Sequence, residues 1–104
     1  MELTYLTPRI RSVTMDGKVA RKMLGEDVAR SFRSVIADMR DAMYLGEVPG
    51  TQEVELADGA VGINLPLGDS AVLEVEPVGV GAGGVSMVHR VKLVRILRDG
   101  KVLA

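Results

Sequence analysis

The spacing of apolar residues changes once along this chain of 104 residues, and that change limits the folds open to it. From Asp27 to Leu45 the spacing is three or four residues, which predicts one buried face of an α-helix. After Gly50 apolar residues recur at every second position, which is typical of strands buried on one face. The sequence therefore predicts an α+β fold with helices packed on one face of a sheet. The expected helix face comprises Val28, Phe32, Val35, Ile36, Met39, Ala42 and Met43.

Shorter segments complete the predicted order. Residues 2–6 alternate like a strand, and residues 8–15 and 18–24 resemble two short helices separated by a turn at Asp16-Gly17. In the last strand the alternation fails near Val94-Arg95, which predicts either a β-bulge or burial of both faces of the strand. The expected architecture is an N-terminal strand, two to three helices and an antiparallel sheet of about four strands. These four strands are predicted at 53–56, 61–65, 71–76 and 88–97, with turns at 58–59 and 66–69 and a glycine-rich loop at 79–84.

Composition excludes several classes of protein. A chain of this length forms one domain, 1–104, that can bury a core without metal or disulfides. There is no cysteine, so disulfides and thiolate metal sites are excluded. No apolar stretch approaches the roughly 18–20 residues that cross a bilayer, and the N-terminus does not resemble a signal peptide. We therefore expect no membrane partner, no cofactor and a cytoplasmic location.

Charge is strongly segregated along the chain. No Lys or Arg lies between Arg40 and Arg90, whereas that window holds eight carboxylates. Residues 1–40 carry eight cations and five carboxylates, and residues 90–104 carry five cations and one carboxylate. Such segregation bears on partners more than on fold. Because Glu74 and Glu76 have no cation near them in sequence, their sheet face is expected to repel a phosphate backbone.

Few residues suggest chemistry by themselves. His89 is the sole histidine, so it cannot form a histidine metal cluster. Glu53 and Glu55, like Glu74 and Glu76, stand two residues apart, which places each pair on one sheet face. Such pairs suit a divalent cation or a small ligand, although they are also common on a solvated sheet face.

Several local strings, taken in order, resemble the RelE/HigB-like toxins of type II toxin–antitoxin systems, in particular the plasmid maintenance killer proteins. The resemblance covers nearly the whole chain. It rests on ARSFRSVIADMRDA at 29–42, LGEVP at 45–49, LPLGDSAVLEVEP at 65–77 and VHRVKLVRIL at 88–97. It implies ribosome-dependent cleavage of mRNA without metal, and neutralisation by a small cognate antitoxin, for example one of helix-turn-helix type.

The chain departs from the family at positions that matter for cleavage. Val72 stands where the family usually has Arg, and Arg98, Asp99 and Gly100 stand where it usually ends in Asp-Tyr-His. The usual acid–base pair is therefore absent, and no Tyr follows Tyr44. The residues left for catalysis are Arg95, Arg98 and His89, and those left for RNA binding are Arg90, Lys92, Lys101, Arg30 and Arg33.

Three hypotheses follow. The first is a toxin-like mRNA endoribonuclease whose activity is weakened or lost, acting on mRNA at the ribosome. The second is a non-catalytic relative that binds a protein partner or forms a homo-oligomer. The third is a metal or small-ligand module that uses the paired glutamates. Guanidinium does not lose its proton in proteins, so neither Arg95 nor Arg98 can serve as a general base.

Overall fold

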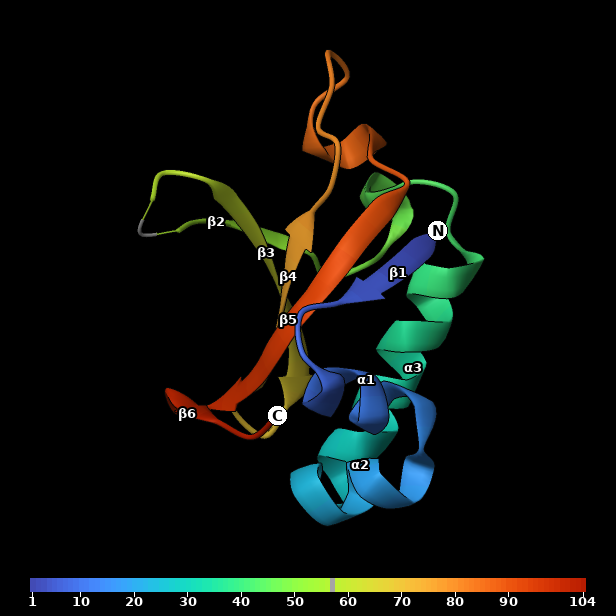
Figure 1. Ribbon diagram of the computed structural model, residues 1–104, viewed down its shortest axis with the longest axis vertical. Coiled ribbons are helices and arrows are strands. Elements are labelled where there is room, and N and C mark those ends of the chain that lie inside the picture. The colour runs from blue at the N-terminus through green and yellow to red at the C-terminus, as the bar shows by residue number, and fades with distance from the viewer. Residues whose placement is uncertain (57) are drawn as a thin grey trace.

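The computed structural model describes residues 1–56 and 58–104 and has an α+β fold (Figure 1). Three helices lie together against one face of a mostly antiparallel sheet. The strands follow the order β1-β5-β4-β3-β2, and β6 pairs with β5 beyond the end of β1. The helices are α1 (Pro8–Met15), α2 (Gly17–Leu24) and α3 (Glu26–Asp41), and the strands are β1 (Glu2–Tyr5), β2 (Gln52–Glu55), β3 (Val61–Gly68), β4 (Ala71–Pro77), β5 (Arg90–Arg98) and β6 (Lys101–Val102).

Side-chain caps fix the first two helices. The Thr7 hydroxyl accepts a hydrogen bond from the Ile10 amide at 3.2 Å, and Pro8 takes the first helical position, where its missing N–H costs little. Asp16 accepts from the Lys18 amide at 2.9 Å and so begins α2 directly. The residues predicted as a turn thus form a helix start, which joins α1 and α2 with a single linking residue.

The long helix ends earlier than predicted. α3 stops at Asp41, and Ala42 is already extended with ψ of 143°. The N-terminal ammonium of Met1 donates to the carbonyls of Arg40 and Ala42, which an ending helix leaves without intrahelical partners. A distant residue therefore caps the helix, and Met43, predicted to be buried, is 64% exposed.

The β3–β4 connection also differs from the prediction. The segment 66–69 was expected to form a turn, but β3 continues to Gly68 and the turn lies at Asp69-Ser70. Both turn residues have positive φ (52° and 60°), as tight hairpin turns between twisted strands require. Pro66 is tolerated in the strand because β2 pairs with β3 only as far as Asn64.

The predicted bulge in the last strand is confirmed. Glu74 is paired with Arg95, but the next residue, Val75, is paired with Leu93. Val94 is therefore the extra residue, and it is 4% exposed. In a regular strand, side chains three positions apart point to opposite faces. The bulge places Lys92 and Arg95 on the same face.

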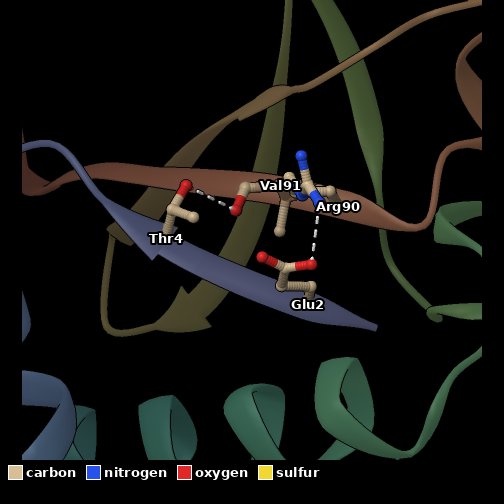
Figure 2. Close-up of polar contacts among 4 residues, drawn as sticks. All are labelled: Glu2, Thr4, Arg90 and Val91. Atoms are coloured by element: carbon tan, nitrogen blue, oxygen red, sulfur yellow. Dashed lines mark hydrogen bonds and ion pairs between the residues drawn. The ribbon is translucent and has the colours of Figure 1, made fainter.

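Strand β1 joins the sheet next to β5, in parallel orientation. Figure 2 shows two contacts that tie these strands together. The Arg90 guanidinium donates to the Glu2 carboxylate at 3.0 Å, and the Thr4 hydroxyl donates to the Val91 carbonyl at 3.2 Å. Strand β6 was not predicted, because two residues are too few to show a period.

The core lies between the helices and the inner face of the sheet. Leu73 and Val75 alternate with Val72, Glu74 and Glu76, so that β4 turns its aliphatic side chains inward as expected. Phe32 and Met39 meet them from α3. Among residues 1–56 and 58–104 no polar or charged residue falls in the buried class, and no helix is long and apolar enough to cross a membrane. The outer face of the sheet carries the charges.

Candidate functional site

The structure does not bring the three predicted catalytic residues together. Arg95 and Arg98 lie on β5, whereas His89 is exposed in the bend that precedes this strand. Arg98 lies nine positions after His89, which along an extended strand is roughly 30 Å. His89 therefore cannot act on the same phosphate as Arg98 within one copy of the chain.

The cations of β5 instead form ion pairs with carboxylates. Arg95 contacts Glu74 at 2.6 Å, and Lys92 contacts Glu76 at 3.1 Å, across the β4–β5 pairing. The remaining two pairs are Arg98 with Asp69 and Arg90 with Glu2, each at 3.0 Å. We call these four contacts the ion-pair ladder.

The ladder corrects the expectation of a repulsive acidic face. That expectation rested on the absence of Lys or Arg near Glu74 and Glu76 in the sequence. Antiparallel pairing places the cation-rich end of the chain beside them, and the bulge at Val94 turns both Lys92 and Arg95 to their face. Lys92 and Arg95 offset the charges of Glu76 and Glu74, so this face neither strongly repels nor strongly attracts phosphate.

The paired glutamates do not gather into a metal site. Glu74 and Glu76 face a guanidinium and an ammonium group, and both also border a hollow with Asp58 and Leu56. Within the described part of the chain there is no group of three or more His, Asp or Glu side chains placed to hold a metal ion. Glu53 and Glu55 remain exposed on the edge strand β2.

Most cations of residues 1–40, unlike those of β5, form no ion pair among the described residues. Arg30 pairs with Asp27 at 3.6 Å, one helical turn away, and both side chains are largely exposed. The other cations of residues 1–40 have no carboxylate within 4.0 Å among the described residues. These cations are Arg9, Arg11, Lys18, Arg21, Lys22, Arg33 and Arg40.

Two of these arginines border a groove. A cavity of about 390 Å³ lies where the end of α1 and the start of α2 meet α3, and Arg33 and Arg40 are part of its wall. We call it the helical groove. Among the described residues no carboxylate lines it, and one exposed side chain at its edge, Met15, is apolar. Its floor is built from Val13, Ala20, Ala29, Phe32 and Ile36.

A third arginine, Arg21, lies close to Arg33. The Nη1 atom of Arg21 and the Nη2 atom of Arg33 are each 3.5 Å from the point that a side-chain carbon at Gly17 would occupy. The two guanidinium groups are therefore separated by at most twice that distance at these atoms. Two cations this close, with no paired carboxylate, create a positive potential at the mouth of the groove.

Of the residues predicted to bind RNA, the structure brings Arg90 and Lys92 into the ladder and leaves Lys101 on β6. Arg33 is the one member that lines the helical groove, and Arg30 is engaged by Asp27. Arg40 was not among the predicted site residues, although its distance of seven residues from Arg33 places both on one helix face. No sequence signal pointed to Arg21, because its position depends on how α1 and α2 meet.

Comparisons with known proteins add no family. No family model matches the chain, no curated protein matches it, and no solved structure matches it. The function must therefore be argued from the two charged surfaces.

Proposed function

We propose that this protein is a non-catalytic binding protein with a RelE/HigB-like fold, which recognises a partner through its helical layer. One observation carries the proposal: the cations of β5 are engaged by the chain's own carboxylates, whereas most cations of the helices are not. Free cations beside an apolar groove are available for recognition. Cations already held in ion pairs must separate from their carboxylates before they can bind another molecule.

The chemistry of RNA cleavage argues in the same direction. Attack by a ribose 2′-hydroxyl needs a general base, a general acid and positive charge at the phosphate. Arg95 and Arg98 can supply only the charge, because guanidinium stays protonated. His89 lies too far along the strand to share a phosphate with Arg98. The carboxylates nearest to Arg95 and Arg98, those of Glu74 and Asp69, are engaged in ion pairs with these arginines.

Within the resemblance to toxin–antitoxin proteins, we propose that the partner is a cognate antitoxin-like protein. Such a partner would bind the helical layer and leave the ladder undisturbed. A partner of opposite charge also suits the free cations, since complementary charge accelerates encounter and selects the partner.

Induced expression tests the proposal. Cells that express the chain alone are expected to grow at the rate of cells that carry the empty expression vector. Mapping of transcript 5′ ends should give identical patterns for the two. Growth arrest accompanied by new 5′ ends inside messages would overturn the proposal, because it would reveal ribosome-linked cleavage.

Cleavage of mRNA is the second candidate, and one observation favours it. The Nε atom of Arg98 is buried and has no hydrogen-bond partner among the described residues, so this side chain retains an unused donor. If the chain does arrest growth, replacing Arg95 and Arg98 by alanine should abolish the arrest. The matched double variant Arg11→Ala/Lys22→Ala, which removes two helical cations, should leave the arrest intact.

A further inference from the structure

We infer that the helical groove binds an acidic amphipathic helix of a partner protein. This inference rests on the proposed function and deepens it, because it names the surface and the chemistry of the partner. The groove combines an apolar floor with a cationic rim, and each part restricts the occupant.

The floor requires an apolar anchor. Val13, Phe32 and Ile36 lie beneath the groove but are almost fully buried. The apolar surface left for an occupant to cover is that of Met15, which is 55% exposed, and of Ala37. A cavity of about 390 Å³ has room for aliphatic side chains of a partner. A fully polar anion would leave this apolar surface in contact with water, so that the surface would add little to the free energy of binding.

The rim sets the charge and the spacing. Arg33 and Arg40 are seven residues apart on α3, which is about 10 Å along the helix axis. A partner helix lying along α3 repeats its side chains with the same two-turn interval. Carboxylates seven residues apart on that helix can therefore meet both arginines while the side chains between them enter the groove. Arg21 adds a third cation beside Gly17.

RNA is a poorer occupant of the same groove. Single-stranded nucleic acid gains much of its binding energy from stacking on exposed aromatic rings. The one aromatic residue that lines the groove, Phe32, is buried, and its ring therefore offers no stacking platform. Positive charge without stacking favours an acidic polypeptide.

The probe is a labelled synthetic peptide of about four helical turns, with leucines at three- and four-residue spacing and glutamates seven apart. We expect fluorescence anisotropy to show binding to the intact chain. Arg33→Gln/Arg40→Gln should weaken it about tenfold or more, since both charge contacts are lost. The matched control Arg11→Gln/Lys22→Gln removes the same charge outside the groove and should change the affinity by less than about twofold.

A second variant tests the site without removing an arginine. Ala37 is exposed, lines the groove, and stands four residues after Arg33 and three before Arg40. The substitution Ala37→Glu therefore places a carboxylate beside both arginines on the same helix face. It should abolish peptide binding while the circular dichroism spectrum and the urea midpoint stay close to those of the original chain.

Four outcomes would overturn the inference. The first is no peptide binding up to about 1 mM, and the second is an equal loss of affinity in the control variant. The third is tighter binding of a single-stranded RNA oligonucleotide at the groove. The fourth is self-association that Arg33→Gln/Arg40→Gln abolishes, because it would identify a second copy of the chain as the occupant. These outcomes are separate from failure of the proposed function. Cleaved transcripts refute the non-catalytic assignment even if the peptide binds, and an unbound peptide refutes the groove even if no transcript is cut.

Discussion

The sheet and the three helices both carry many cations, but the two regions use them differently. On the sheet, four cations of β5 each contact a carboxylate. Three of these carboxylates belong to the segment between Arg40 and Arg90, which has no Lys or Arg, and the fourth belongs to β1. In the helical layer, Arg21, Arg33 and Arg40 gather around a groove that has no carboxylate among the described residues of its wall. The difference teaches that a count of cations does not locate a binding surface. What matters is which cations the fold leaves without an internal partner.

Pairing geometry explains the difference. Charges segregated along the chain can still meet when antiparallel strands bring one segment beside the other, and β4 and β5 do this over seven residue pairs. A cation on the outer face of a helix meets a carboxylate from a distant segment only where another element covers that face. The cations of α2 and α3 therefore remain exposed to solvent.

The largest expected effect comes from Phe32, which belongs to the core and also to the floor of the groove. Phe32→Ala should lower the free energy of unfolding by about 3–5 kcal/mol, because it leaves a cavity between α3 and the sheet. Phe32→Leu should cost only about 1 kcal/mol. Urea denaturation measures both values. A loss below about 1 kcal/mol for Phe32→Ala would show that the groove floor is not part of the common core.

The ladder should respond next. Glu74 is 19% exposed and contacts Arg95 at 2.6 Å, so Glu74→Lys would place like charges together at a partly buried site. We expect a loss of about 2 kcal/mol in unfolding free energy. The double variant Glu74→Lys/Arg95→Glu restores opposite charges and should recover most of it.

An exposed pair provides the control for this prediction. Asp27 and Arg30 are 87% and 71% exposed, and Asp27→Lys should lower stability by less than about 1 kcal/mol, most of it from the lost interaction with the N-terminal end of α3. Equal losses of unfolding free energy from Glu74→Lys and Asp27→Lys would contradict the view that the ladder stabilises the sheet whereas exposed charges on the helix surface contribute little to the stability of the fold.

The smallest effect is expected from the groove arginines. Arg33→Gln/Arg40→Gln should change the free energy of unfolding by no more than about 0.5 kcal/mol, because neither side chain holds a carboxylate among the described residues. Urea unfolding provides the measurement. A loss above about 1 kcal/mol would mean that these arginines stabilise the fold, and the comparison between the two regions would then fail.

Much of the fold could be predicted because its signals are local. The alternation of Leu73 and Val75 with charged neighbours gave the correct inner face of β4, and the broken alternation at Val94 located the bulge. Errors arose where a distant group decides the structure. The end of α3 depends on the ammonium of Met1, and the turn after β3 depends on the pairing register with β4.

The candidate site was less predictable for the same reason. Arg33 was identified from the sequence, but the groove it lines forms only when the α1–α2 corner meets α3. Arg95 and Arg98 were identified as candidate catalytic residues, and Arg90 and Lys92 as candidate RNA-binding residues. The fold engages all four in ion pairs.

By itself the sequence determined the α+β class, the faces of the main elements and the uneven distribution of charge, because periodicity and composition act over a few neighbouring residues. Only the tertiary structure decided which charges neutralise one another and which remain available to a partner. That choice depends on distances of a few ångströms between segments far apart in the chain, and over such distances Coulomb energy changes steeply.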